Sequence, residues 1–306
     1  MKKEISQALS LTDQQVALLY SHSYLNILNI LTNDLTTLAK HRGNAGAFQG
    51  SRRMLHRIKN TLDDIKLPLL TPHQIQDVHN FVEQEIAGEF REALPSEKDQ
   101  AAVDETINNI RSLFRILYNL IRVRTYHPDN LDTWVTHSIS DIKRNIEDLL
   151  TAIETNSRGS YRIVDSQTHQ EENEYLFTLT IESPDNNTLF MPPVLQDCMR
   201  DLIANARKYT SPGGQISALL SNDGQKLVLE VRDDGRGIPE QEIDRVVHFG
   251  YRGKNSGERT QGGGFGLTKA CYITQKMGGR MWIDSVPEKG TVITLKIPIP
   301  EAAEDR

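Results

Sequence analysis

The spacing of apolar residues divides the chain into two halves of different kind. From residue 9 to about residue 153, apolar side chains recur at helical intervals, and glycine is rare outside residues 43–50. Breaks in this pattern at residues 42–50, 67–72, 93–97 and 127–130 predict about five helices. Good helix-starting residues stand at three of these breaks: Thr71-Pro72, Ser96 and Asp129.

After residues 156–159 the pattern becomes that of β-strands. Branched and aromatic residues gather in short runs bounded by turns, at residues 161–164, 175–181 and 227–231. Two further runs, 281–285 and 291–297, flank a turn at 287–290, and residues 267–276 are helix-patterned. We therefore predict an α+β protein, with a helical region at 1–157 and an α/β domain at 158–306.

Three motifs in the second half combine polar residues with glycine. They are Asp201-Leu202-Ile203-Ala204-Asn205, Asp233-Asp234-Gly235-Arg236-Gly237 and Gly262-Gly263-Gly264-Phe265-Gly266. A single glycine motif of this kind usually marks a turn. The chain has no Gly-x-x-x-x-Gly-Lys-Ser/Thr phosphate loop, and the last motif follows a long loop rather than a strand, unlike a Rossmann site.

Taken together in this order and spacing, the three motifs resemble the ATP-binding domain of the sensor histidine kinases. The superfamily of that domain also holds gyrase, the 90-kDa heat-shock protein and MutL. Residues 249–254 resemble the kinase segment that leads into the ATP lid, and residues 281–297 resemble the family's terminal hairpin. The resemblance implies an N-terminal helical bundle followed by a C-terminal α/β-sandwich ATPase domain.

The resemblance also implies a role for each motif, with ATP and Mg²⁺ as cofactors. The Asp233 carboxylate would accept a hydrogen bond from the adenine amino group, and Asn205 would offer its amide oxygen to Mg²⁺. Asp201 would hold a metal-bound water, and backbone amides of the last glycine loop would hold phosphate oxygens. The implied ATP site comprises Asn205, Lys208, Tyr209, Asp233, Gly235, Gly237, Ile238, Arg252, Lys254, Gly262, Gly264, Phe265, Gly266, Leu267 and Thr291.

A histidine kinase also needs a phosphoacceptor histidine on a helix, and two histidines compete for this role. His22 follows a serine and precedes Asn26 by one helical turn, as in the kinase H-box. The next position is Ser23, however, where the family usually carries a carboxylate that serves as general base. The alternative is His56, whose surroundings resemble the His-Arg-x-Lys-Asn box of another kinase subfamily.

Helical periodicity favours His22. The first helix has an apolar seam that puts His22 on its edge, and the seam of the second helix leaves His56 further out. The two seams are Leu18, Leu25, Leu28, Leu35 and Leu55, Ile58, Leu62, Ile65. We expect an exposed His22, with Asn26 holding an attacking water or contacting the lid. The helix pair 19–40 and 51–66 resembles the kinase dimerisation hairpin, which implies a homodimer.

Composition narrows the choice of partners. The chain of 306 residues has a formal charge of −6 and a pI of about 5.9, which disfavours nucleic-acid binding. No apolar run reaches membrane-spanning length, and Cys198 and Cys271 lack metal-binding spacing, which is typical of buried thiols in a cytoplasmic protein. With no receiver or membrane-sensor pattern in the chain, we expect a separate response regulator and a possible upstream sensor protein.

The expected function is therefore an ATP-dependent protein-histidine kinase of a two-component system, itself a phosphoprotein. One alternative is a phosphotransferase or phosphatase with weak or no autokinase activity, which Ser23 favours. Another is a protein Ser kinase resembling the mitochondrial dehydrogenase kinases, which also place a helical bundle before this ATPase domain. A conformational ATPase like MutL would need a further domain after the ATPase domain.

Overall fold

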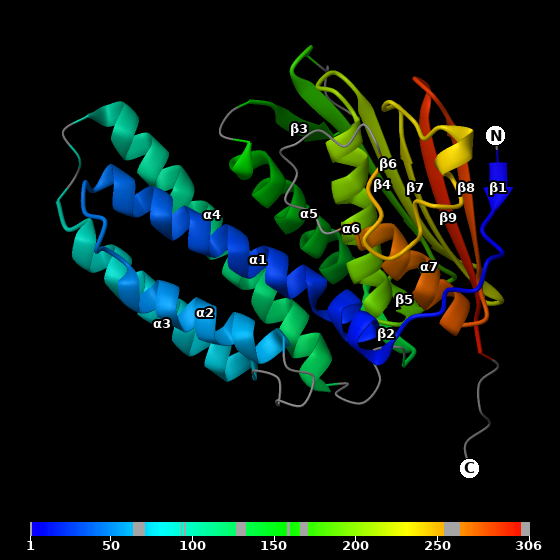
Figure 1. The fold of residues 1–306 in the computed structure, drawn as a ribbon, viewed down its shortest axis with the longest axis horizontal. Helices are drawn as coiled ribbons and strands as arrows, with labels where there is room; N and C mark the ends of the chain where they lie inside the picture. The colour runs from blue at the N-terminus through cyan, green and yellow to red at the C-terminus, as the bar shows by residue number, and fades with distance from the viewer. Residues whose placement is uncertain are drawn as a thin grey trace. The chain divides into compact units, whose positions relative to one another are not determined.

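The computed structural model describes residues 2–63, 71–92, 94, 96–126, 133–157, 160–165, 171–253 and 264–300. The chain divides into two compact units (Figure 1). The first comprises residues 1–19, 130–147 and 159–306, and the second comprises residues 20–129 and 148–158. The first unit contains the α/β domain and the second is helical. Among the described residues, no helix is both long and apolar enough to cross a membrane.

The amino-terminal half contains five helices in its described part, as the apolar pattern predicts. They are α1 (Asp13–His41), α2 (Gln49–Asp63), α3 (Pro72–Glu89), α4 (Glu97–Tyr126) and α5 (Ile139–Asn156). The start of α3 shows why the sequence signal was clear. Thr71 and Gln74 exchange hydrogen bonds in a capping box, and Pro72 occupies the first turn, where its missing N–H costs nothing.

The core of the helical unit is built on a seam of α1 whose members alternate in steps of four and three residues. The seam packs in one apolar cluster with α2, α3 and α4, and its buried residues on α1 are Tyr24, Leu28, Leu31, Leu35 and Leu38. The expected seam is thus only partly right: Leu28 and Leu35 are buried, whereas Leu18 and Leu25 are half-buried. The side chains of Leu62 and Ile65 lie outside the described residues.

The carboxyl-terminal domain is a seven-stranded sheet with the strand order β1-β8-β9-β7-β6-β4-β3. The strands are β1 (Lys2–Glu4), β3 (Arg162–Asp165), β4 (Glu174–Glu182), β6 (Gln215–Asn222), β7 (Lys226–Asp233), β8 (Arg280–Val286) and β9 (Gly290–Pro298). Helices α6 (Val194–Tyr209) and α7 (Gly266–Lys276) pack on one face of this sheet (Figure 1). Apolar side chains alternate onto the covered face, for example Leu227, Leu229 and Val231 of β7. The expected α/β sandwich is confirmed.

Four strands were not foreseen: β1, β6, β2 (Val135–Ser138) and β5 (Thr188–Met191), the last two forming a separate antiparallel pair. The short strand β1 pairs with β8 and extends the sheet edge. Just after it, the Ile5 N–H donates to the Met281 carbonyl at 2.9 Å, and the Gln275 side chain bonds the backbone of Gln7 and Leu9. The amino terminus is therefore part of the α/β unit, unlike the expected division at residue 157, because three residues are too few to show a strand period.

Candidate functional site

Asp233 lies at the end of β7, where the sequence motif predicts it. One carboxylate oxygen accepts a hydrogen bond from the backbone N–H of Gly235 at 2.9 Å. Burial raises the pKa of the Asp233 carboxyl to about 6, and the negative charge of Asp234 adds to this increase. Hydrogen bonds from the backbone N–H groups of Gly235 and Thr291 oppose it. A half-buried carboxyl with a raised pKa at a strand end is typical of a functional site.

The glycines after Asp233 are required by backbone packing. A Cβ atom at Gly235 would lie 2.4 Å from the carbonyl oxygen of Tyr209, the last residue of α6. At Gly237, φ is +68° and a Cβ atom would lie 2.2 Å from the carbonyl oxygen of Val286 in β8. Neither position accommodates a side chain. The loop therefore lies in close contact with the end of α6 and the β8–β9 turn. This contact is a second reason for the glycines, in addition to the close approach of a ligand that the motif predicts.

A hydroxyl on β8 secures the same loop. The Ile238 N–H donates to the Ser285 hydroxyl at 2.8 Å, and that hydroxyl donates to the Gly290 carbonyl at 3.0 Å. The Thr291 hydroxyl oxygen lies 2.9 Å from the Ser285 hydroxyl oxygen. The structure therefore brings Ile238 and Thr291 together as the motif implies. Ser285 was missed, because a serine in a strand carries no sequence signal.

Helix α6 presents Asp201 and Asn205 one turn apart, facing the start of α7. A Cβ atom at Gly266 would lie 3.0 Å from the Asn205 amide nitrogen and 3.3 Å from the Asp201 Cβ. The first residue of α7 must therefore be small to let the two helices meet here. At the end of α6, the Tyr209 ring has two cations over it, with Lys208 Nζ at 4.9 Å and the Arg236 guanidinium at 4.5 Å from its centroid.

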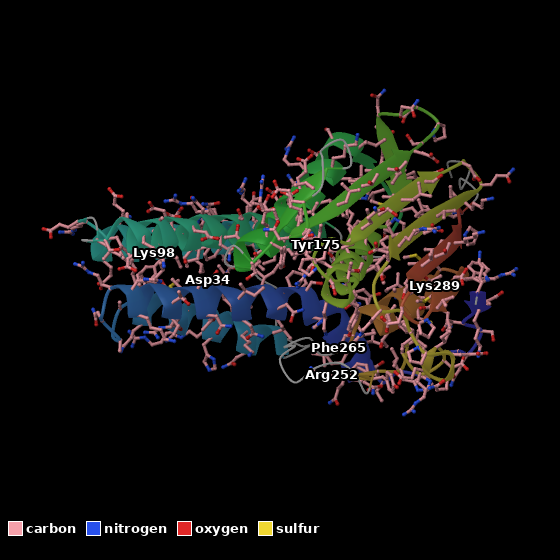
Figure 2. The ribbon with its side chains drawn as sticks, turned by 90° about the horizontal axis from the view of Figure 1, so that it is seen from above. Asp34, Lys98, Tyr175, Arg252, Phe265 and Lys289 are labelled. Carbon is pink, nitrogen blue, oxygen red and sulfur yellow. The ribbon has the colours of Figure 1, made fainter. Side chains whose placement is uncertain are left out.

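The two ends of the expected lid are held together. The rings of Phe249 and Phe265 lie 4.7 Å apart, and a Cβ atom at Gly264, with φ of +73°, would lie 2.6 Å from the Tyr251 carbonyl oxygen. Figure 2 labels Phe265 and Arg252, which directly follow Gly264 and Tyr251 in the chain. Arg252 is exposed, and Leu267 is half-buried in α7. Lys254 and Gly262, both expected in the nucleotide site, lie outside the described residues.

A hollow of about 360 Å³ also borders Asp233 and Thr291, but most of its lining belongs to the other face of the sheet. Arg232, Asp284 and Val292 line it, and their side chains alternate away from the face covered by α6 and α7. The hollow therefore differs from the predicted nucleotide site, which is expected on the α6 and α7 side, where Asn205 and Gly266 meet.

The two candidate phosphoacceptors have similar partners and different exposure. His22 Nε2 lies 3.2 Å from the Asn26 amide nitrogen, and His56 Nε2 lies 3.4 Å from that of Asn60. His56 is exposed, whereas His22 has 9% of its surface exposed. The expectation of an exposed His22 is thus wrong in this structure. Ser21, Ser23 and Tyr24 are buried as well.

The two cysteines are free and buried, as expected. Burial raises the pKa of the Cys271 thiol to about 12, which leaves it protonated and unreactive at neutral pH. Both cysteines lie in helices beside the site, Cys198 in α6 and Cys271 in α7. They contribute to packing and not to the chemistry.

Comparison with known proteins agrees with this geometry for part of the chain. Residues 192–301 match the family of histidine kinase-, DNA gyrase B- and HSP90-like ATPases. Sensor histidine kinase WalK of Bacillus subtilis (strain 168) is 37% identical over 108 residues, 34% of this chain and 18% of WalK. Adaptive-response sensory kinase SasA of Synechococcus sp. (strain CC9902) is 36% identical over 106 residues, 34% of this chain and 28% of SasA.

Among solved structures, the mycobacterial sensor histidine kinase MprB is similar over 54% of this chain and 97% of that chain, with 20% identity and a TM-score of 0.39. The chain spans less than a third of the length of the two curated relatives, which match it over 18% and 28% of their lengths. The family match covers Asp201, Asn205, Asp233 and Gly266 and leaves the helical unit outside. Residues 192–301 are therefore an ATPase domain of the histidine kinase, gyrase and HSP90 type.

Proposed function

We propose that the chain is an ATP-dependent protein-histidine kinase of a two-component system. It would phosphorylate His22 and pass the phosphoryl group to a response regulator. The observation that carries this proposal is the assembly of Asp233, the Gly235–Gly237 loop, Asn205 and Gly266 in a domain of the ATPase family. The names of WalK and SasA, a sensor histidine kinase and a sensory kinase, support the choice of kinase over the family's other activities.

The transfer step makes defined demands on His22. One ring nitrogen of the neutral imidazole attacks the γ-phosphorus in line, so that an N–P bond forms as the bond to the β,γ-bridging oxygen breaks and ADP leaves, and the proton on the other ring nitrogen is then released to solvent. If the Asn26 amide donates to Nε2, the ring proton is on Nδ1 and Nε2 carries the lone pair. Before Nε2 can attack, its hydrogen bond with the Asn26 amide must break and the imidazole ring must become accessible. Together with Ser23 in place of a carboxylate, this supports a slow autokinase.

Magnesium fits the site only together with a nucleotide. Among the described residues, no group of three or more His, Cys, Asp or Glu side chains is placed to hold a metal ion by itself. The Asn205 amide oxygen is a hard ligand, and Asp201 one turn earlier can hold a metal-bound water. Mg²⁺ characteristically keeps several waters and takes its other ligands from phosphates. When bound it would neutralise charge on the phosphate oxygens, while Asn205 and Asp201 fix its place.

The homodimer stays part of this proposal, supported by the resemblance of the helix pair 19–40 and 51–66 to the kinase hairpin. The buried residues of α1, with Leu55 and Ile58 of α2, pack inside this chain's own helical cluster. The response regulator, an upstream sensor protein and a cytoplasmic location stay proposals, supported by the kinase-like domain and by the kinase names of its relatives.

Two alternatives have a specific observation behind them. His56 is exposed and has Asn60 one turn on, so it satisfies the access requirement that His22 does not meet in this structure. A phosphotransferase or phosphatase with weak autokinase activity is favoured by Ser23 and by the burial of His22. The Ser kinase alternative has no comparable support beyond the placement of a helical unit before the ATPase domain.

The test is incubation of the full chain with γ-labelled ATP, followed by treatment of the labelled protein with acid and with base. A phosphohistidine loses its label in acid and keeps it in base, and a phosphoserine behaves in the opposite way. Acid-labile label that moves to a response regulator supports the histidine kinase. Acid-stable label on a partner protein would support the Ser kinase. ATP binding without any label would leave the conformational ATPase.

A further inference from the structure

The interior of the ATPase domain holds a lysine that the proposed mechanism does not use. Lys269 lies in α7, one turn after Gly266, and its side chain is 1% exposed. An ammonium group out of water is strongly unfavourable unless nearby carboxylates compensate its charge. Two carboxylates of α6 lie close to it. Lys269 Nζ lies 3.2 Å from an Asp201 oxygen and 3.8 Å from an Asp197 oxygen.

A second ion pair adjoins Lys269. Asp197 is also paired with Arg200 within α6. The side chains of Asp197, Arg200 and Asp201 are between 10% and 15% exposed. Buried ion pairs contribute little net stability, because apolar residues of similar volume do as well or better in their place. What such a pair contributes is a fixed position for both partners.

Lys269 fixes the position of the Asp201 side chain. Asp201 and Asn205 share the face of α6 that meets Gly266, so Lys269 joins α7 to the carboxylate one turn before the proposed metal ligand. Its contact engages one oxygen, Oδ2, and so restricts the rotation of the carboxyl group. Its charge also cancels that of Asp201. A polyphosphate approaching this end of α6 therefore meets a neutral pair instead of a repelling carboxylate.

We infer that Lys269 is a positioning residue of the nucleotide site, acting through Asp201 on the binding of the phosphate groups. The inference rests on the proposed binding of ATP between α6 and α7. It differs from an ordinary structural role in one measurable respect. If Lys269 only holds the helices together, its replacement should change the affinities for adenosine and ADP equally. If Lys269 masks the Asp201 charge, its replacement should lower the affinity for ADP, which carries phosphates, more than the affinity for adenosine.

The experiment compares the affinities of adenosine and ADP, without Mg²⁺, for the full chain and its variants by calorimetric titration. Lys269→Leu should weaken ADP binding on the order of tenfold or more, because it exposes the phosphates to an uncompensated buried carboxylate. Adenosine binding should change by less than about threefold, since neutral adenosine has no charge for Asp201 to repel. Lys276→Leu is the matched control, the same change at an exposed lysine of the same helix.

The double variant Lys269→Leu/Asp201→Asn separates the two explanations even if Lys269→Leu folds poorly, because it removes the uncompensated charge together with the lysine. It should recover most of the lost ADP affinity. Equal losses for adenosine and ADP, or no recovery in the double variant, would overturn the inference and leave the nucleotide site in place. A wild-type chain that binds neither ligand would instead overturn the proposed function and the inference with it.

Discussion

The ATPase domain and the helical unit carry their chemistry in different ways. In the ATPase domain, Asp233 stands at a strand end and the adjoining glycines are required by close backbone contacts, so residue type and backbone geometry are linked. In the helical unit, His22 and His56 both lie in regular helices with an asparagine one turn on. The regular helical backbone at either position does not by itself require a particular residue type. Backbone-linked sites therefore leave a specific sequence signal, whereas sites in regular helices depend on what packs around them.

The largest expected effect concerns the helical unit, where two histidines compete for the role of phosphoacceptor. His22→Gln should abolish acid-labile label from γ-labelled ATP, because glutamine has no ring nitrogen to attack the phosphorus. His56→Gln should leave the label intact. Scintillation counting of the gel-separated chain measures both. Loss of label in His56→Gln alone would move the phosphoacceptor to α2, and full label in both variants would exclude the phosphohistidine mechanism.

In the ATPase domain, the predicted adenine contact can be tested at Asp233. Asp233→Asn should weaken binding of an ATP analogue on the order of tenfold to a hundredfold, as expected for losing about 1–3 kcal/mol at a buried polar contact. The thermal unfolding temperature at neutral pH should be at or above that of the wild type, since asparagine has nearly the same size and shape and lacks the charge that burial disfavours. Asp185→Asn is a control at an exposed aspartate in the same domain. Unchanged affinity in Asp233→Asn would show that the base binds elsewhere.

Gly237 tests whether the loop is held by backbone contact. Gly237→Ala should lower the free energy of unfolding by about 2–4 kcal/mol, since it combines a left-handed φ with a clash against the Val286 carbonyl. Gly224→Ala is the matched control, because Gly224 has φ of +86° and nothing within 4 Å of an added Cβ. It should lose only about 1 kcal/mol. Urea unfolding of both variants measures the difference, and equal losses would mean that the Val286 contact contributes nothing.

The smallest expected effect is a pH dependence. In the proposed site the ionised Asp233 carboxylate would accept a hydrogen bond from the adenine amino group, and the pKa of this carboxyl is raised to about 6. Adenosine affinity should therefore fall several-fold as pH drops from 7.5 to about 5, with a midpoint near 6. Adenosine has no phosphate to titrate in this range. NMR titrations at several pH values measure it, and a flat profile would contradict the adenine contact.

The raised pKa of the Asp233 carboxyl also predicts how the free energy of unfolding depends on pH. The sign of this dependence is opposite to that of the adenosine affinity. The native state holds the Asp233 proton more tightly than the unfolded chain, whose carboxyl has the usual pKa of 3.8. The stabilisation from this group is therefore fully present below about pH 3.8 and is lost as pH rises through about 6. Asp233→Asn should remove this component from the pH profile of the unfolding free energy.

The elements with strong local signals were the ones that could be predicted. The breaks between helices, the capped start at Thr71 and the hairpin of β8 and β9 follow from spacing, caps and turn residues. Strand β1 was missed because three residues show no period, and β2 and β5 because four residues show little. The seam of α1 was placed partly wrong, because several apolar stripes can be drawn on one long helix.

The amino-acid sequence by itself determined the α+β class and the nucleotide motif, because glycines at strand ends are tied to their backbone geometry. Only the tertiary structure decided what surrounds each side chain. It buried His22, packed the apolar seam of α1 within the helical cluster of this chain and paired the buried Lys269 with Asp201. Burial and ion pairing are sums over residues far apart in the chain, and no local pattern encodes them.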